Sequence, residues 1–481
     1  MKNNPLLLID GYKSSHHMMY PDKTTLVYSN FTPRSINRMP NEAKEIVVFG
    51  MQYAIKYIHN IFNDNFFNIS KDVVINEAKT VLSKYLSCDY DVSHFEKLHD
   101  LGYLPIKIKC LEEGLIINEK IPILTIQNTL PDFFWLTNFL ETLFSSLIWK
   151  PLHSASIAFA FKKILYKYAK LTDKNNIDFI DFQGHDFSFR GMQHCEAAIS
   201  SGLGWLTSFK GSDTVPAVSA AEYYYGGDNI GFSVPATEHS VMTAYGKENE
   251  IAAFEHLLNK FPTGILSIVS DSFDLWSVID NILPLIKEKI LLRDGKLVIR
   301  PDSGDPVNII CGTNENKGVV EKLWDIFGGS INDQGYKMLD KHIGCIYGDS
   351  ITLERAEAIC EKLQKNGFAS TNCVFGVGSY SLGYATRDSQ GCAIKATYCV
   401  IDGKCVDIFK EPITDDGEKK SAKGLLMVYF DDKGNVNLKD KCSIEEEQSG
   451  LLRTVYIDGL LSNNNDYNSI RSNIDCALKM S

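Results

Sequence analysis

The chain has 481 residues, of which 44% are hydrophobic and 23% are charged, and its formal net charge is −11. This composition is typical of a globular protein with a large core, and the length predicts two or three domains. The negative charge argues against nucleic acid as a partner. Any polyphosphate must therefore be bound by a few local Arg and Lys residues.

The cysteines and the apolar segments indicate the cellular compartment of the protein. Twelve cysteines occur singly between Cys88 and Cys476, without a CxxC pair, which predicts reduced thiols rather than a zinc ribbon or a disulfide framework. The apolar run before Asp10 is too short for a signal peptide. The most apolar stretch, 133–149, falls short of the ~20 residues that span a bilayer. We therefore expect a cytoplasmic protein with no membrane partner.

The first part of the chain, residues 1–150, mixes helical and strand-like periodicities. Short strands with polar alternation are typical of a partly antiparallel sheet, so we expect an N-terminal α+β domain here. The spacing of apolar residues predicts strands over 25–31, 106–108, 115–117 and 121–126, and helices over 73–86, 133–149 and 156–171.

Between 151 and 388 an architecture repeats. A short apolar run ends in a cluster of polar and Gly residues, and a helical segment usually follows, at the spacing of about 25 to 45 residues that βα units have. The runs end at HDFSFRG (185–191), FKGSDT (209–214), SVPATEHS (233–240), SIVSDSFD (267–274), LVIRPDSGDP (297–306), CIYGDSI (345–351) and VFGVGSY (374–380). In βα barrels the chemistry lies where strands end, so we predict one site built from all seven ends.

A barrel explains this pattern better than an open sheet, since a doubly wound sheet would concentrate polar groups at fewer switch points. We therefore predict an α/β fold with an irregular or incomplete βα barrel at 151–388. Residues 389–481 contain strand-like runs at 394–401, 405–409 and 424–430 with hairpin-like turns. This segment is predicted to return to the N-terminal domain, which becomes a mixed α+β domain built from both chain ends.

Several strand ends carry groups suited to phosphate and ribose. Arg300 and Asp302 flank a proline, and the planar fork of an arginine matches phosphate oxygens, although an ordinary Arg–Asp pair in a turn explains the motif equally well. Gly378 lies in a GxG turn whose N–H groups can point at an anion. Asp349 can hold a ribose hydroxyl or cap the following helix.

Other strand ends carry side chains that could bind a flat heterocyclic ring. Phe187 and Arg190 can stack a heterocycle and bind its phosphate, or be a core Phe and a surface Arg. His239 is a candidate for acid/base or nucleophilic work, against the alternative of a structural histidine. Asp213 alone indicates a turn residue or a helix cap, and the run 193–196 matches no common metal-site spacing. Together the ends predict an enzyme that acts on a phosphosugar or a nucleotide.

Ten strings in fixed order resemble the nicotinamide phosphoribosyltransferase family. They are IDGYKSSHHMMYP, HDFSFRG, FKGSDT, SVPATEHS, SDSFD, IRPDSGDP, YGDS, FGVGS, TRD and FKEP, and they extend from Asp10 to about Lys423. The resemblance implies a type II phosphoribosyltransferase fold and a homodimer with shared active sites. It also implies NAD salvage, in which nicotinamide and 5-phosphoribosyl 1-pyrophosphate give nicotinamide mononucleotide. Nicotinate phosphoribosyltransferases share the general architecture but fewer of these motifs, and they are the alternative family.

The resemblance assigns residues to the nicotinamide ring. Phe187 would stack on one face of the ring, and Tyr12 of the other subunit would stack on the opposite face. Arg190 would contact the amide region or the product phosphate. Asp213 would accept a hydrogen bond from the carboxamide NH₂, and Ser270 would lie near the same amide.

The resemblance also assigns residues to the ribose, to phosphate and to ATP. His239 would be phosphorylated by ATP, which couples ATP hydrolysis to tighter substrate binding, so Mg²⁺ and ATP are the expected cofactors and His239, Asp274 and Asp302 the expected catalytic residues. The residues around the ribose and the Mg²⁺–pyrophosphate are Asp274, Asp302, Gly348 and Asp349, of which Asp274 and Asp302 are the candidate metal ligands. The residues expected at phosphate are Arg300, Gly378, Ser379, Arg387, Lys395, Lys410 and Lys419, and Asp10 is a further substrate contact.

Two segments depart from the family pattern. Ser379 and Tyr380 stand where several members have glycines, which predicts a tighter backbone cradle, and the segment 305–335 differs in length and receives no function. A signalling protein or a nucleotide-binding regulator without turnover is the alternative from another class. The intact Asp213, His239 and Arg300 argue against it.

Overall fold

The structure is a computed structural model that describes residues 4–410, 422–462 and 465–480. The chain divides into two compact units. The first contains Met1–Ser156, Ala221–Gly227 and Ala385–Met480, and the second contains Ile157–Ala220 and Asp228–Tyr384. The first unit thus joins both ends of the chain, whereas the second is nearly continuous in sequence.

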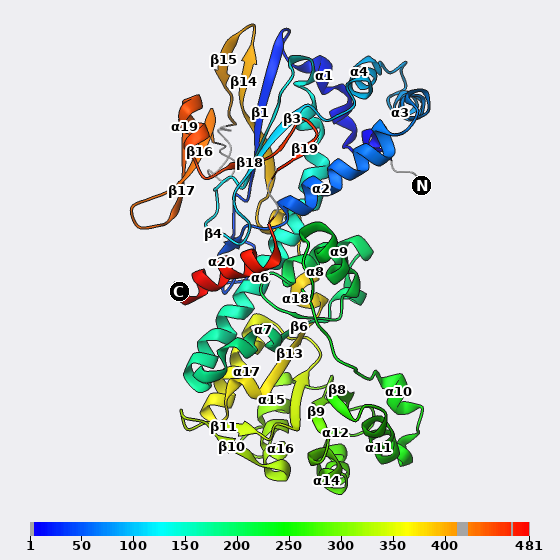
Figure 1. Cartoon of the computed structure of the whole chain (residues 1–481), viewed down its shortest axis with the longest axis vertical. Coiled ribbons are helices and arrows are strands. Elements are labelled where there is room, and N and C mark those ends of the chain that lie inside the picture. Colours follow the sequence, from blue (N-terminus) through cyan, green and yellow to red (C-terminus); the bar gives the residue numbers. More distant parts are fainter. Residues whose placement is uncertain (1–3, 411–421, 463–464, 481) are drawn as a thin grey trace. The chain divides into compact units, whose positions relative to one another are not determined.

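An antiparallel sheet of seven strands forms the centre of the first unit. Figure 1 shows β1 from the N-terminal part beside β14 from the C-terminal part. In their antiparallel pairing Asn30 lies opposite Lys395. In sheet order the strands are β15 (Lys404–Asp407), β14 (Ala393–Ile401), β1 (Thr24–Thr32), β5 (Leu124–Asn128), β3 (Ile106–Cys110), β18 (Arg453–Ile457) and β19 (Leu460–Leu461). This confirms the prediction of a mixed α+β domain built from both chain ends.

Helices cover this sheet with their apolar faces. In α2 (Met51–Phe62) the residues Met51, Ile55, Ile58 and Phe62 recur every three or four positions and are all buried in one core cluster with residues of the sheet. The other helices of the unit are α1 (His16–Met19), α3 (Lys71–Leu86), α4 (Ser93–Leu101), α5 (Leu136–Phe139), α19 (Ile444–Ser449) and α20 (Tyr467–Met480). Two small sheets pair β2 (Ile46–Val47) with β4 (Ile116–Ile117) and β16 (Leu425–Phe430) with β17 (Val436–Cys442).

Helix α6 (Glu141–Thr172) corrects the prediction of two separate helices at 133–149 and 156–171. Pro151 lies inside this helix of 32 residues. A proline removes one helical hydrogen bond and usually kinks or ends a helix. Here its ring packs against Gly50, where a Cβ would come within 2.6 Å of Pro151 Cγ. This tertiary contact outweighs the local preference of the proline to end the helix.

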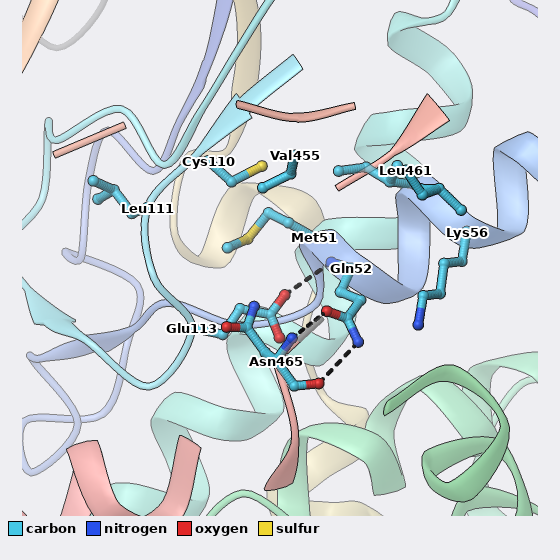
Figure 2. Close-up of a pocket in the computed structure, with 10 residues that line it drawn as sticks. Met51, Gln52, Lys56, Cys110, Leu111, Glu113, Val455, Leu461 and Asn465 are labelled. Carbon is cyan, nitrogen blue, oxygen red and sulfur yellow. Dashed lines mark hydrogen bonds between the residues drawn. The ribbon is translucent and has the colours of Figure 1, made fainter. Parts of the chain in front are cut away.

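A small cavity in the first unit surrounds the start of α2 (Figure 2). The buried carboxylate of Glu113 accepts a hydrogen bond of 2.9 Å from the backbone N–H of Gln52, and the side chain of Gln52 bonds in turn to the backbone of Asn465. The cavity has a volume of about 20 Å³, enough for one water molecule and too small for a substrate. Its role is structural, because Glu113 satisfies an orphan N–H at a helix start.

A parallel sheet of six strands forms the second unit. In sheet order these are β7 (Gly211–Ser212), β6 (Gly184–Asp186), β13 (Cys373–Val377), β12 (Ile343–Tyr347), β9 (Asp294–Arg300) and β8 (Thr263–Val269). The helices between them include α8 (Cys195–Trp205), α10 (His239–Thr243), α11 (Glu250–Lys260), α12 (Leu275–Ser277), α15 (Pro306–Cys311), α16 (Val319–Phe327), α17 (Leu353–Lys365) and α18 (Ser379–Gly383). A hairpin of β10 (Gly329–Ile331) and β11 (Lys337–Leu339) precedes β12.

The segment 232–237 connects the two edges of this sheet. Phe232 forms a parallel bridge to Gly211 of β7, and Ala236 forms a parallel bridge to Ser267 of β8. Backbone hydrogen bonds on both sides hold the segment between the two edge strands. The sheet therefore curls into an irregular βα barrel, as predicted, in which the segment 232–237 takes the place of a regular strand. No helix in the described part of the chain has the length and apolarity that a bilayer span needs.

Candidate active site

A cavity of about 480 Å³ lies inside the barrel of the second unit. Its walls follow from strand alternation: in β9 the buried Leu297 and Ile299 face away from the cavity, whereas Lys296, Val298 and Arg300 line it. The same alternation brings His185 of β6 and Ile265 and Ser267 of β8 to the cavity wall. The last inward-facing residues of the strands therefore meet at the carboxyl end of the barrel, where the sequence predicts the site.

Asp213 lies at this end, directly after β7. Its Oδ1 is 2.9 Å from His185 Nε2 and accepts a hydrogen bond of 2.5 Å from the Ser233 hydroxyl. Burial opposes ionisation of Asp213, but the hydrogen bonds from His185 and Ser233 and the charge of Arg300 outweigh it. They hold the pKa of this carboxyl below its ordinary value. Asp213 is thus an ionised acceptor at the cavity wall, not a helix cap.

Phe187 presents an aromatic ring to the same cavity. Its backbone N–H bonds to Val377 O at 2.9 Å, and a Cβ on Gly376 would come within 2.4 Å of its ring. The ring of His185 lies 5.0 Å away, centroid to centroid. The side chain is therefore fixed by close contacts on β13 and β6, as a stacking residue for a flat ligand must be.

A second group of polar side chains surrounds His239 at the start of α10. Its Nε2 is 3.7 Å from Asp302 Oδ2 and 3.9 Å from Asp271 Oδ1, and its Nδ1 is 2.9 Å from Ser272 Oγ. Arg300 donates to Thr237 O at 2.7 Å and has its Nε 3.6 Å from Asp302 Oδ1. The imidazole is half exposed, with Nδ1 at Ser272 and Nε2 facing the two carboxylates.

The two carboxylates of this group suit a divalent cation. Asp271 accepts hydrogen bonds from the backbone N–H of Asp302 and the hydroxyl of Ser303, but the buried Asp271 Oδ1 and Asp302 Oδ1 have no hydrogen-bond partner among the described residues. Burial, together with the charges of Asp271 and Asp349, raises the pKa of Asp302 despite Arg300 and His239. Because Mg²⁺ binds one or two carboxylates plus substrate oxygens, this donor set fits it.

Two predicted residues take other positions. Asp274 is exposed and caps α12, where its carboxylate accepts from the N–H groups of Trp276 and Ser277. Ser270 is fully buried, and its hydroxyl donates to Ile268 O at 2.7 Å rather than facing the cavity. The structure thus does not bring these two side chains to the cavity wall.

The glycines at the other strand ends permit close packing. A Cβ on Gly348 would come within 2.2 Å of Asp302 Oδ1, so glycine allows the strand end to approach this carboxylate. Asp349 is exposed and accepts a hydrogen bond from Ser350. Gly378 precedes α18 with open space around its Cα.

Arg190 lies on the exposed turn at 189–191, next to Gly191. A Cβ on Gly191 would come within 1.8 Å of Ser379 Oγ. The turn that carries Arg190 therefore packs directly on the start of α18. The Arg190 side chain is exposed to solvent at this edge of the barrel.

The remaining predicted residues lie in the first unit. Tyr12 has 63% of its surface exposed, and Asp10 accepts a hydrogen bond of 2.8 Å from Thr142 Oγ1. Arg387 is half exposed beside Asp388. Burial is the main cause that lowers the pKa of Lys395, and the nearby cations Arg34, Lys13 and Lys410 lower it further, although Glu141 opposes this. Such a gathering of cations suits a polyphosphate. Lys419 lies outside the described residues.

Three residues of the candidate site were not predicted: His185 and Ser233 on the cavity wall, and Asp271 beside His239. Asp271 follows β8 in phase with the inward-facing Ser267, so strand alternation could have favoured it over Asp274. His185 is likewise in phase with Phe187. Ser233 carries no such signal, because 232–237 is not a regular strand and pairs through isolated bridges.

Two family models match this chain. The model of the nicotinate phosphoribosyltransferase (NAPRTase) family matches residues 182–459, and that of the nicotinamide phosphoribosyltransferase N-terminal domain matches residues 4–108. A nicotinamide phosphoribosyltransferase of Acinetobacter baylyi is 46% identical over 98% of this chain and 97% of its own length. One of Mycoplasma pneumoniae is 37% identical over 88% of this chain and 97% of its own.

The chain belongs to the nicotinamide phosphoribosyltransferase family. It is therefore a pentosyl-transferring enzyme, and the predicted resemblance is confirmed. Two solved structures show the same fold: nicotinate-nucleotide pyrophosphorylase of Pyrococcus furiosus, with a TM-score of 0.60, and human nicotinic acid phosphoribosyltransferase, with a TM-score of 0.58. Each is 15% identical and is matched over 98% of this chain and 94% of its own, so they bear on the family's fold alone.

Proposed function

We propose that the enzyme transfers phosphoribose from 5-phosphoribosyl 1-pyrophosphate to nicotinamide, giving nicotinamide mononucleotide and pyrophosphate for NAD salvage. The observation that carries this proposal is the ionised Asp213 beside the fixed ring of Phe187 on one cavity wall. An aromatic ring can stack on a pyridine, and an acceptor-only carboxylate can bind the carboxamide NH₂. Phe187 and Asp213 therefore match the two parts of nicotinamide.

The same carboxylate disfavours nicotinate, the alternative substrate. Nicotinate would bring a second negative charge to Asp213, whereas nicotinamide brings a hydrogen-bond donor. The repulsion and the missing donor act in the same direction, which is how a single residue discriminates two ligands of equal shape.

The reaction needs orientation and charge stabilisation more than proton transfer. The pyridine nitrogen already has a free electron pair and forms the new bond to ribose C1. The C1–O bond to pyrophosphate breaks, and its electron pair leaves with the pyrophosphate. A transition state with oxocarbenium character is expected by analogy with glycoside chemistry. Arg300 would contact phosphate, and the contacts of Phe187 and Asp213 with the nicotinamide ring would hold the attacking nitrogen in line.

Magnesium would be bound by carboxylates of the barrel together with the pyrophosphate oxygens. Asp271 and Asp302 have the buried oxygens without partners, so we propose them as the protein ligands, with Asp349 beside them. The described ranges contain no group of three or more His, Cys, Asp or Glu side chains that could hold a metal ion. When bound, Mg²⁺ would stabilise charge on the leaving pyrophosphate.

ATP would stimulate the reaction by phosphorylating His239, with Nε2 between Asp271 and Asp302 as the acceptor atom. Incubation with labelled ATP should give acid-labile label in the wild type and in His194→Ala, a control at the exposed start of α8, but none in His239→Ala. Equal label in His239→Ala would exclude this role. Synthesis of the mononucleotide without ATP should persist in that variant, since ATP coupling is accessory.

We further propose a cytoplasmic homodimer. Tyr12, largely exposed in this chain, would stack on the nicotinamide bound by the partner subunit. All twelve cysteines are free thiols, as expected in a reducing compartment. Sedimentation at assay concentration should give a dimer, and full activity in a monomer would contradict the shared site.

The first experiment supplies purified protein with phosphoribosyl pyrophosphate and Mg²⁺, adds nicotinamide or nicotinate separately, and identifies the mononucleotide formed. Reaction with nicotinamide alone is the expected result. A faster reaction with nicotinate would favour the alternative substrate and overturn the assignment to Asp213. No reaction with either ring would overturn the proposed function.

A further inference from the structure

Both hydrogen bonds to the Asp213 carboxylate end on the same oxygen. His185 Nε2 lies 2.9 Å and Ser233 Oγ lies 2.5 Å from Oδ1, whereas Oδ2 has no partner among the described residues. A lone carboxylate rotates about its Cβ–Cγ bond and exposes either oxygen. Two donors on one oxygen remove that freedom and leave the other oxygen available to a ligand.

We propose that His185 and Ser233 are positioning residues for substrate choice: they anchor Asp213 through Oδ1 so that Oδ2 is presented to the carboxamide NH₂ of nicotinamide. This inference rests on the proposed function. It goes beyond it by assigning the discrimination between amide and acid to a group of three residues rather than to Asp213 alone. Neither positioning residue needs to touch the reacting atoms.

Close packing fixes the side chain of His185. A Cβ on Gly211 would come within 2.7 Å of His185 Nδ1, so the imidazole packs closely on Gly211 of β7. The imidazole is also 5.0 Å, centroid to centroid, from the ring of Phe187, which directly follows β6. The residue that would stack the ring and the residue that orients the amide acceptor are therefore two positions apart, one in β6 and the other just after its end.

The ionised state of Asp213 determines which way the bonds run. A carboxylate only accepts, so His185 Nε2 must carry the hydrogen, and the Ser233 hydroxyl must donate as well. Three groups face the carboxylate: His185 from β6, Ser233 from 232–237 and, through its charge, Arg300 from β9. Burial raises the pKa of Asp213 and the two hydrogen bonds lower it, so loss of either donor raises this pKa. It also lets the carboxylate rotate more freely.

Substitutions that remove or keep each donor test this role. We expect Ser233→Ala and His185→Leu each to lower the nicotinamide/nicotinate ratio of kcat/KM by about tenfold, the size of one hydrogen bond to a charged group. The loss should appear in KM for nicotinamide, with kcat and KM for phosphoribosyl pyrophosphate little changed. Ser233→Thr and His185→Gln, which retain a donor, should restore most of the ratio.

His342→Leu is the matched control. His342 Nδ1 lies 2.7 Å from Asp340 Oδ1, a similar pair placed before β12 at the amino end of the strands, so its loss should leave the ratio unchanged. A pH series adds a readout that simple damage to the fold would not give. In Ser233→Ala the preference for nicotinamide should disappear at a higher pH than in the wild type, because Asp213 protonates more easily.

The outcomes separate the two levels of the proposal. An inactive wild type would overturn the proposed function. An active wild type in which Ser233→Ala and His185→Leu keep both the ratio and its pH profile would overturn the positioning role while the function stands. A fall in the ratio that the donor-retaining variants do not restore would also overturn it, since that result indicates packing rather than hydrogen bonding.

Discussion

Two carboxylates of the barrel have environments that move their pKa values in opposite directions. Hydrogen bonds from His185 and Ser233 overcome burial at Asp213 and lower its pKa, whereas burial beside other acids raises the pKa of Asp302. Asp213 is thereby kept charged as an acceptor for an amide. At Asp302 the nearby Arg300 and His239 do not outweigh burial and the neighbouring acids, so a divalent cation would add charge that favours the ionised form.

Asp213→Asn should weaken the preference for nicotinamide. Two unit charges about 4 Å apart repel by roughly 4 kcal/mol at an effective dielectric of about 20. Because the Asp213 side chain is 45% exposed, solvent screens part of this repulsion. We therefore expect the nicotinamide/nicotinate ratio of kcat/KM to fall by about a hundredfold. Asp325→Asn, at an exposed pair with Lys317, is the control. An unchanged ratio would rule out charge as the basis of discrimination.

Sequence patterns located the site but not each of its side chains. The polar cluster after each apolar run marks a strand end, and the order of the motifs led to Phe187, Asp213, His239 and Asp302. The string SDSFD offered two carboxylates three residues apart; Asp271, in phase with the inward-facing Ser267 of β8, faces His239, whereas Asp274 caps a helix. Side-chain direction depends on tertiary register, which composition does not encode.

At the scale of elements, local preferences were overridden where tertiary contacts compete with them. Pro151 did not end α6 because its ring packs against Gly50. The segment 232–237 completes the barrel without being a regular strand, since it pairs with β7 and β8 only through isolated bridges. Both features depend on partners distant in sequence, so periodicity alone could not predict them.

The turn at 189–191 and the start of α18 should show a compensating pair of substitutions. A Cβ on Gly191 would come within 1.8 Å of Ser379 Oγ and 2.5 Å of Ser379 Cβ. Gly191→Ala should therefore displace the turn that carries Arg190, lower Tm by several degrees and raise KM for phosphoribosyl pyrophosphate, since overpacking typically costs about 1–3 kcal/mol. Adding Ser379→Gly should restore most of both losses. Strictly additive effects would contradict this contact.

The start of α2 should make stability depend on pH through Glu113 (Figure 2). Burial raises the pKa of Glu113 to about 7, against the hydrogen bond from the Gln52 backbone. A pKa raised above the ordinary value of 4.5 means that its stabilising contribution is present below pH 4.5 and is lost as the pH rises to about 7.

Glu113→Gln should remove this dependence. Between pH 5 and pH 8 the free energy of unfolding of the wild type should fall relative to Glu113→Gln by on the order of 3 kcal/mol, as measured by denaturant titration. Glu112→Gln, at the exposed neighbouring position, should behave like the wild type. Parallel curves for wild type and Glu113→Gln would show that Glu113 titrates normally.

At the scale of the whole molecule, the proposed substrate contacts are distributed over both compact units. Phe187, Asp213 and Asp302 belong to the second unit, whereas Tyr12 and Lys395 belong to the first, whose sheet needs both ends of the chain. In the proposed dimer each site combines Asp302 of one subunit with Tyr12 of the other. A substitution of Tyr12 and a substitution of Asp302 therefore affect the same site only when they lie on different chains.

Mixing two inactive variants therefore tests the shared site. Tyr12→Ala and Asp302→Ala homodimers should each be nearly inactive. After co-refolding, half of the dimers are mixed, and each mixed dimer has one site with both native residues and one site with neither, so activity should recover to about a quarter of the wild type. If Tyr12 instead acts on the nicotinamide of its own subunit, every site of a mixed dimer carries one defect, and no activity should return.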